Sequence, residues 1–396
     1  MNILFLIRSI GKGIGGVEVV TINLANELIA KGHQISIFVF TKGNAEVLDR
    51  LNKNIKLYVG NGYKNSNENS DYLREIFIRH NVDIVVNQWG LPYLPIKVIN
   101  RARRGMNIKV ISVYHNDPIT NGRLKNIENA LSKTSNLLKC FCLKIKWHIW
   151  KSITSHSMRY VYNHSDRYMV LSPSHVEHFE SFTNMQDTTK LIIQTNPVTI
   201  DSSTYIFDTS NKQKEILYVG RIDYNQKRVY RVIDTWALLE NKYPDWKLTI
   251  VGDGCERKNL EIKTEKMGLK RVSFEGLKNP LEYYKRASIL LLTSEYEGFG
   301  LVIVEAMSFG VVPIVYGSYS AVYDIIENGK DGIILPYSKE GYNAQSVIPN
   351  IVSIMEDENK YYKIALSALE KSNQFSIENI ANSWERILAQ LISEEN

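Results

Sequence analysis

The sequence predicts an α/β protein with two doubly wound domains, each built on a parallel sheet covered by helices. The chain has 396 residues, too many for a single ordinary hydrophobic core. Short apolar runs typical of buried parallel strands alternate with segments of helical periodicity. This alternation stops in the polar stretch 200–214 and then restarts, as expected for a linker between domains. We therefore predict one domain over residues 1–199 and a second over residues 200–375.

The first domain opens with a strand, a glycine loop, a helix and a second strand, the order that starts a doubly wound fold. The strands are expected at 2–7 and 35–40, the loop at 11–16, and the helix from Val17 to Lys31. Three further buried strands are expected at 82–87, 109–114 and 167–171.

The second domain repeats the alternation, and one more helix follows it. Strands are expected at 215–220, 246–252, 272–275, 289–293 and 311–316. Helices are expected at 229–240, 257–267, 280–286 and 301–309. The tail 376–392 carries a single apolar stripe, typical of an amphipathic helix, and Ser376 is its expected N-cap.

Composition excludes several classes of protein. Hydrophobic residues make up 44% and charged residues 23%, which fits a soluble globular protein. The three cysteines offer neither a disulfide framework nor zinc-binding spacing. We expect a cytoplasmic protein, because the N-terminus lacks the features of a signal peptide and no window is apolar enough to span a membrane.

The charge is uneven along the chain. Residues 1–200 carry 25 Lys and Arg against 14 Asp and Glu, a net +11, whereas residues 201–396 carry 23 against 28, a net −5. A basic first half is compatible with nucleic acid, an anionic membrane surface or an anionic substrate, and equally with an ordinary scatter of surface charge.

Two carboxylates flank a glycine-bearing turn between a predicted strand and a predicted helix. Glu297 precedes the helix and Glu305 lies inside it, while Gly298 and Gly300 allow close backbone approach. Ligands of open α/β sheets lie at the carboxyl ends of strands, and the N–H groups of a helix N-terminus favour an anion. The segment therefore predicts a phosphate on backbone amides beside a carboxylate that binds hydroxyls. The alternative for each Glu taken alone is a solvated surface charge.

The loop from Gly11 to Gly16 fits the G-x-G-x-x-G dinucleotide fingerprint. That fingerprint also requires an acidic residue at the end of the second strand, and this strand runs into Thr41 and Lys42 instead. A nicotinamide or flavin enzyme is therefore disfavoured. Glu18 either complements the helix dipole or contacts a ligand.

Two cations follow the first strand of the second domain. Arg221 can bind a phosphate bidentately, and Lys227 can act as a point charge. Gly252 ends the next strand in a turn with exposed backbone. Together with Glu305, these residues predict a diphosphate site with a carboxylate for ribose hydroxyls. A solvated basic loop is the alternative.

These motifs resemble those of retaining glycosyltransferases with the GT-B fold, of the family 4 (group 1) type. The resemblance rests on Gly220-Arg221-Ile222-Asp223 with Lys227, on Glu297 with Glu305, on Gly15-Gly16-Val17-Glu18, on Ser172, and on Asn196-Pro197-Val198. It extends over almost the whole chain and is weakest at 51–70 and 120–160. It implies two Rossmann-like domains facing a central cleft, with the C-terminal helix, about 376–396, returning to the first domain.

The resemblance also implies a role for each matching residue. Arg221 and Lys227 would bind the donor diphosphate and help it to leave, and Glu305 would bind the ribose. Glu297 and His115 would face the donor sugar, although His115 could instead cap its strand as a structural residue. Further donor contacts would come from Gly15, Gly16, Phe299, Gly300 and Leu301.

The expected reaction is transfer of a hexose, with retention of configuration, from a nucleoside diphosphate sugar. A UDP-sugar is favoured as donor and a glycan or lipid-linked glycan as acceptor, in cell-surface polysaccharide synthesis. The resemblance implies front-face attack, in which the leaving phosphate takes the proton of the acceptor hydroxyl. No D-x-D metal motif is evident, so we expect no essential metal and no other cofactor.

One loop departs from the family pattern. Many relatives have Gly-Gly-x-x-Glu after the last predicted strand, where this chain reads Gly317-Ser318-Tyr319-Ser320 and continues to Asp324. The identity of the sugar therefore cannot be carried over. A sugar-nucleotide epimerase, a phosphorylase and a non-catalytic sugar-nucleotide-binding module are the alternatives to a transferase.

The segment 139–151 interleaves lysines with large apolar and aromatic residues. This composition is typical of a helix at the surface of an anionic bilayer, and it would suit a lipid-linked acceptor at the inner face of the cytoplasmic membrane. A core-packing helix with lysines on its solvent face is the alternative. Nucleic acid is not expected as a partner, because no fold signature supports it.

Overall fold

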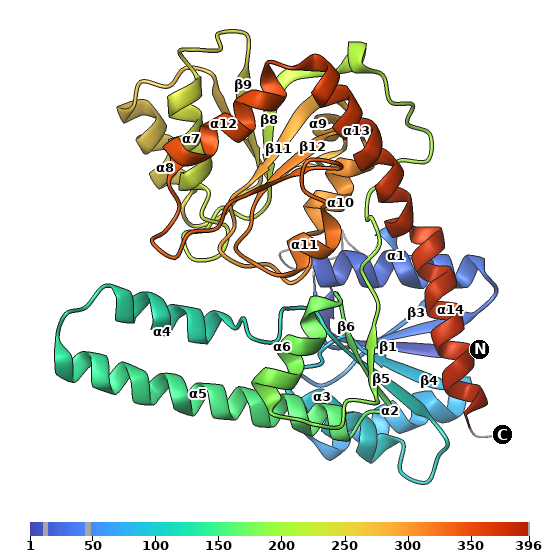
Figure 1. Cartoon of the computed structure of the whole chain (residues 1–396). Coiled ribbons are helices and arrows are strands. Elements are labelled where there is room, and N and C mark those ends of the chain that lie inside the picture. The colour runs from blue at the N-terminus through green and yellow to red at the C-terminus, as the bar shows by residue number, and fades with distance from the viewer. Residues whose placement is uncertain (11–14, 44–48, 395–396) are drawn as a thin grey trace. The chain divides into compact units, whose positions relative to one another are not determined.

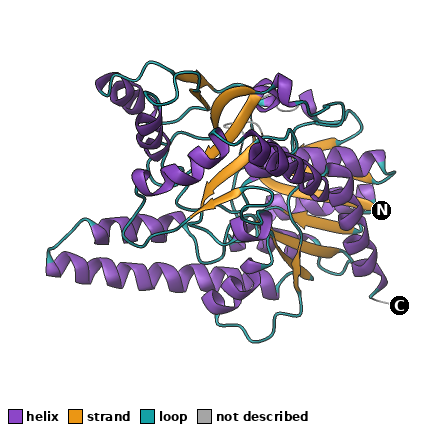
Figure 2. Cartoon of the chain, turned by 45° about the horizontal axis from the view of Figure 1, so that its top comes forward, coloured by secondary structure: helices purple, strands orange, loops and turns teal. Residues whose placement is uncertain are grey.

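The computed structural model describes residues 1–10, 15–43 and 49–394 (Figure 1). Their contacts divide the chain into two compact units. Unit 1 consists of Met1–Thr199 and Ser376–Asn396, and unit 2 of Ile200–Phe375. Each unit contains one parallel sheet flanked by helices (Figure 2), so the predicted α/β class is confirmed.

Unit 1 has a seven-stranded sheet in the order β3-β2-β1-β4-β5-β6-β7. The strands are β1 (Asn2–Ile10), β2 (Gln34–Lys42), β3 (Lys56–Val59), β4 (Ile84–Asn87), β5 (Lys109–Tyr114), β6 (Arg167–Val170) and β7 (Leu191–Ile193). The strand order reverses between β1 and β4, which makes their carboxyl ends a topological switch point. The five predicted strands of this domain are all present, and the short edge strands β3 and β7 are additional.

The helices of unit 1 are α1 (Gly16–Ala30), α2 (Asn67–His80), α3 (Tyr93–Ala102), α4 (Gly122–Ser132), α5 (Leu137–Asn163), α6 (Ser174–Thr183) and α14 (Ile377–Ser393). Ser376 caps α14 as expected, since its hydroxyl accepts a hydrogen bond from the Asn379 N–H at 3.2 Å. The helix packs against α1, where Glu385 lies 3.4 Å from the Lys31 ammonium and 2.9 Å from the His33 ring.

Unit 2 has a six-stranded sheet in the order β10-β9-β8-β11-β12-β13. The strands are β8 (Gln213–Val219), β9 (Lys247–Val251), β10 (Val272–Gly276), β11 (Ala287–Leu292), β12 (Val312–Tyr316) and β13 (Ile333–Leu335). The helices are α7 (Tyr230–Leu239), α8 (Arg257–Lys266), α9 (Leu281–Arg286), α10 (Leu301–Met307), α11 (Ala321–Ile325), α12 (Ala344–Met355) and α13 (Glu358–Ser372). The switch point lies between β8 and β11, and every residue of β11 and β12 is buried.

Three predicted boundaries in unit 2 are wrong by about two residues. The strand expected to start at residue 289 is β11, which starts at Ala287. The linker was expected to reach residue 214, but β8 begins at Gln213. The helix expected at 301–309 ends at Met307, because Gly310 turns the chain with a φ of 65° and Val311 donates its N–H to the carbonyl of Ala306.

Candidate active site

The predicted cations and acids of unit 2 follow two neighbouring strands at the switch point of its sheet. Arg221 and Lys227 come after β8, and Glu297 comes after β11. Because parallel strands end at the same edge of a sheet, the two loops meet there. The site is thus located where α/β sheets bind ligands.

Lys227 and Glu297 form an ion pair across these loops. The Lys227 Nζ lies 2.5 Å from the Glu297 Oε1, and the side chains are only 15% and 7% exposed. Ser294 donates its hydroxyl to the same oxygen at 2.6 Å. The sequence assigned the two residues to different parts of the donor, and the structure shows that they also contact each other directly.

Arg221 extends beside this pair with a side chain that is 62% exposed. Its Nε lies 2.8 Å from the Asp223 Oδ2, and its NH2 donates to the Gln226 Oε1 at 2.7 Å. Burial raises the pKa of Asp223, but hydrogen bonds from Arg221 and from the backbone N–H groups of Gln226 and Lys227 outweigh it and hold the pKa below its ordinary value. The guanidinium is therefore fixed by a charged carboxylate and still accessible to an anion.

Gln226 was missed by the sequence analysis. Its amide accepts from Arg221 and donates to the Glu297 Oε2 at 3.4 Å, so it links the exposed cation to the buried pair. A side-chain amide carries N–H donors and a carbonyl acceptor, and Gln226 uses both kinds of group here. In the sequence, the only indication that Gln226 belongs to the site is its position next to Lys227.

Glu305 lies on α10 and is 6% exposed. The hydroxyl of Tyr284 from α9 donates to its Oε2 at 3.0 Å. This tyrosine was also missed, because no motif connects α9 with α10. The helix and the tyrosine together hold the carboxylate in one orientation.

The glycines of the site are required by close packing as well as by turns. A Cβ on Gly252 would lie 1.9 Å from the carbonyl oxygen of Gly220, so the loops after β8 and β9 can touch only if this residue is glycine. Gly300 is the N-cap of α10 with a φ of 98°. Leu301 begins that helix, and the Phe299 side chain is buried against Phe375, so only its backbone can face a ligand.

The predicted glycine loop of unit 1 lies partly outside the described residues, which resume at Gly15. Gly15 is the N-cap of α1 and Gly16 its first residue. Burial raises the pKa of Glu18, while hydrogen bonds from the backbone of Glu18 and Gly15 act against this rise. The carboxylate thus caps its own helix, which favours the dipole alternative for Glu18 over ligand contact.

His115 follows β5 and lies close to the end of β4. Its Nε2 is 2.6 Å from the Gln88 Oε1, and burial lowers the pKa of His115 to about 4. The ring is therefore neutral at pH 7 and can act as a hydrogen-bonding group. Two residues further on, Asp117 lies 2.8 Å from the Nδ1 of His178, an acid–imidazole pair that the sequence did not reveal.

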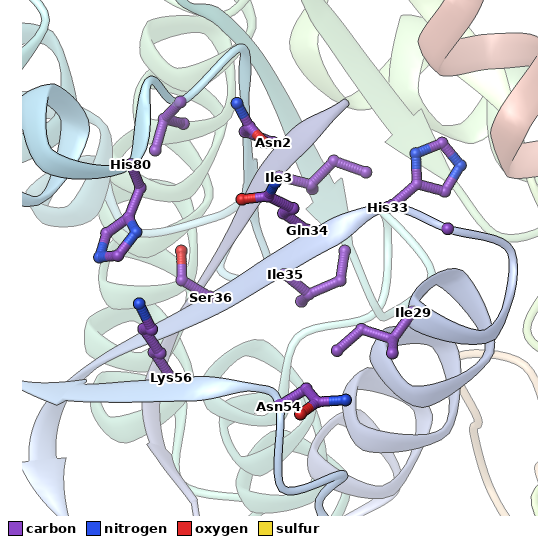
Figure 3. A pocket seen from close by; sticks show the side chains of 12 residues that line it. Asn2, Ile3, Ile29, His33, Gln34, Ile35, Ser36, Asn54, Lys56 and His80 are labelled. Carbon is purple, nitrogen blue, oxygen red and sulfur yellow. The ribbon is translucent and has the colours of Figure 1, made fainter.

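A separate hollow of about 370 Å³ lies at the amino ends of β1, β2 and β3, away from the predicted site residues (Figure 3). Both of its histidines already have partners within unit 1. His33 contacts Glu385 at 2.9 Å, and the His80 Nε2 forms a hydrogen bond with the Tyr58 hydroxyl. Because the hollow lies at the amino ends of these strands, it is not the predicted donor site.

Two features are absent from the described residues. They contain no group of three or more His, Cys, Asp or Glu side chains arranged to hold a metal ion. Within the same ranges, no helix is both long and apolar enough to cross a bilayer.

Two doubly wound units, one with paired cations and acids at its switch point, define an α/β protein of the GT-B type. Residues 14–198 match the family described as Glycosyltransferase Family 4, and residues 204–370 match Glycosyl transferases group 1. The chain therefore belongs to this family of glycosyltransferases, and the resemblance seen in the sequence is confirmed.

Individual relatives agree with this assignment. An uncharacterized glycosyltransferase of Haemophilus influenzae is 25% identical over 97% of this chain and 99% of its own length. An undecaprenol-diphosphate glycan α-1,4-N-acetylgalactosaminyltransferase of Campylobacter jejuni is 28% identical over 62% of this chain and 65% of its own. The structure of Anabaena HepE in complex with UDP-glucose has a TM-score of 0.74 at 18% identity, covering 98% of this chain and all of that one. The similarity to HepE shows a shared fold.

Proposed function

We propose that the protein is a retaining glycosyltransferase that moves a hexose from a UDP-sugar to a glycan in cell-surface polysaccharide synthesis. The observation that carries this proposal is the Lys227–Glu297 pair beside the accessible guanidinium of Arg221 at the switch point. The proposal is supported by HepE, which has been crystallised with UDP-glucose, and by the Campylobacter relative, whose name describes transfer of N-acetylgalactosamine to a lipid-linked glycan.

Each proposed donor contact follows from charge and burial. Arg221 binds the diphosphate, because its guanidinium is held in place yet exposed. Lys227 adds a second positive charge at the bond that breaks. Glu305 accepts hydrogen bonds from the ribose hydroxyls, and the backbone of Gly300 and Leu301 contacts the donor.

In the proposed reaction, the bond between the anomeric carbon and the phosphate oxygen breaks while the acceptor oxygen bonds to the same face. The acceptor proton passes to the phosphate oxygen that leaves. Arg221 and Lys227 stabilise the negative charge on that leaving group, and preorganised charges of this kind are often the largest catalytic term. Glu297 is a poor nucleophile, because Lys227 and Ser294 already occupy its Oε1. It acts instead by stabilising positive charge on the sugar ring.

The proposal is tested by donor binding, turnover and stereochemistry. We expect calorimetry to detect binding of UDP and of at least one UDP-sugar. NMR should show that the new glycosidic bond has the same anomeric configuration as the donor. Substitution Arg221→Ala should lower turnover by at least about a hundredfold. Lys214→Ala serves as control, since this exposed lysine lies at the opposite end of β8. An inverted product, or full activity in Arg221→Ala, would contradict the proposal.

Metal independence is a second part of the proposal. The two cations that face the diphosphate supply the positive charge that a divalent ion provides in other transferases. We expect turnover to stay within about twofold after dialysis against EDTA, and addition of Mg²⁺ or Mn²⁺ to the dialysed enzyme to change little. If dialysis abolished turnover and either ion restored it, the positive charge at the diphosphate would come from a metal.

A further part of the proposal is that the enzyme works at an anionic membrane surface, which it reaches through α5. This helix forms a hairpin with α4 that projects from the rest of unit 1 (Figures 1 and 2). Its first half carries exposed apolar side chains, with Leu138 at 79% and Phe141 at 64% exposure, followed by Ile145 and Ile149. At 100° per residue these four side chains form one stripe.

The same half of α5 packs on α4 through the opposite side. The Trp147 Nε1 donates to Glu128 of α4 at 3.0 Å, and the Arg123 guanidinium lies 4.5 Å above the Trp150 ring. The first half of α5 therefore packs on α4 by one side and leaves an apolar stripe exposed on the other.

Charge favours a lipid surface over a second copy of the chain as the partner of this stripe. Residues 137–163 contain no Asp or Glu, and lysines border the stripe on both sides, Lys139 and Lys146 on one and Lys144 on the other. Two such faces would repel each other, whereas anionic headgroups attract them.

Vesicle flotation tests the membrane proposal without any turnover. We expect binding to vesicles that contain phosphatidylglycerol and little binding to pure phosphatidylcholine at low salt. The double substitution Phe141→Ser and Ile145→Ser should abolish binding. Ile78→Ser is the control, since this exposed isoleucine lies on α2 of the same unit. Equal binding by both variants, or dimerisation through the stripe, would contradict the proposal.

A further inference from the structure

Tyr319 carries a buried hydroxyl that no described residue satisfies. The side chain is 5% exposed, and its hydroxyl has no hydrogen-bond partner within the described ranges. Buried hydroxyls are almost always hydrogen-bonded, because burying one without a partner is costly. An unsatisfied hydroxyl next to a ligand site therefore points to a group that binds there.

The position of Tyr319 is fixed from two sides. It follows β12, which neighbours β11 in the sheet, and the adjacent Ser318 donates its hydroxyl to the carbonyl of Ser294 at 2.6 Å. A Cβ added to Gly300 would lie 3.2 Å from the Tyr319 hydroxyl. The hydroxyl thus lies next to Gly300, on the same loop as Glu297.

Electrostatics identifies the kind of group that fits. Burial raises the pKa of Tyr319 well above its ordinary value, and the charge of Glu297 raises it further. The hydroxyl is therefore a neutral donor and acceptor near a carboxylate. A phosphate at this position would be repelled by Glu297, whereas a sugar hydroxyl could bond to both groups.

We propose that the Tyr319 hydroxyl hydrogen-bonds a hydroxyl of the transferred sugar and helps to select that sugar. The inference rests on the proposed function, because it places a UDP-sugar in this site. It also assigns a role to the loop that departs from the family pattern, where the sequence left the identity of the sugar undetermined.

The substitution Tyr319→Phe isolates this contact. We expect the affinity for UDP alone to stay within about twofold, because the nucleotide does not reach the hydroxyl. Affinity and kcat/KM for the preferred UDP-sugar should fall about threefold to tenfold, the usual value of one neutral hydrogen bond. Without ligand, the variant should be at least as stable as the wild type, since it buries one unsatisfied group fewer.

Donor analogues identify the partner hydroxyl. A UDP-sugar that lacks this hydroxyl should bind the wild type about threefold to tenfold more weakly than the complete UDP-sugar does. The affinity for this analogue should be the same in Tyr319→Phe as in the wild type. Tyr243→Phe is the control, because the Tyr243 hydroxyl contacts Glu356 at the surface of unit 2, and all ligand affinities should be unchanged.

Three outcomes would overturn the inference. Equal affinity of wild type and Tyr319→Phe for every UDP-sugar that the wild type binds would show that the hydroxyl makes no such contact. An equal loss for UDP alone would place the contact on the nucleotide. Absence of UDP-sugar binding in the wild type would refute the proposed function, and the inference with it, which is a different result from the first two.

Discussion

At the scale of single residues, the buried ion pair at the switch point has consequences for stability as well as for chemistry. Removing one partner of such a pair leaves an uncompensated charge in a site with little water. We expect Lys227→Met to lower the free energy of unfolding by about 3 kcal/mol, measured by urea denaturation. Adding Glu297→Gln should restore part of that loss, while turnover stays low in both variants. A double variant that is less stable than the sum of the single changes predicts would refute a direct pair.

The buried imidazole of His115 makes stability depend on pH. Its folded pKa of about 4 lies below the ordinary value of 6.5, so the unfolded chain binds more protons between these pH values. Stability is therefore lost as the pH falls from about 6.5 towards 4. We expect urea midpoints at pH 7.5 and pH 5 to differ more for the wild type than for His115→Gln. His156→Gln, at an exposed position on α5, should behave like the wild type.

At the scale of elements, the contact between the loops after β8 and β9 depends on one glycine. The Cβ of Gly252→Ala would clash with the carbonyl of Gly220, next to Arg221. We expect a loss of stability of at least about 2 kcal/mol and weaker binding of UDP. Gly268→Ala is the matched control, because Gly268 also has a positive φ but open space around its Cα. It should cost about 1 kcal/mol and leave UDP binding unchanged.

The elements also show what a sequence can predict. Strands such as β5, β6 and β12 were predicted well, because apolar runs report burial directly. Motif spacing was enough to place Arg221, Lys227 and Glu297 at one sheet edge. The contacts of Gln226 and Tyr284 were missed, since they depend on how side chains from different loops and helices pack. The hairpin of α4 and α5 was missed because α5 is apolar on more than one side.

At the scale of the whole molecule, unit 1 is assembled from two separate parts of the sequence. Deleting residues 376–396 removes α14, whose Glu385 contacts Lys31 and His33. We expect the truncated chain to lose the cooperative unfolding of unit 1 in calorimetry, while the transition of unit 2 persists. Adding the missing helix as a separate peptide should restore part of the loss. Unchanged unfolding of the truncated chain would mean that α14 contributes little.

The return of α14 also bears on how the protein is made. A ribosome releases the chain from its N-terminus, so all strands of both sheets emerge before the last helix does. The end of α1 around Lys31 and His33 therefore stays uncovered by α14 while the remaining strands of unit 1 and the whole of unit 2 are synthesised. Until α14 has been synthesised, this face of unit 1 is open to chaperones and proteases.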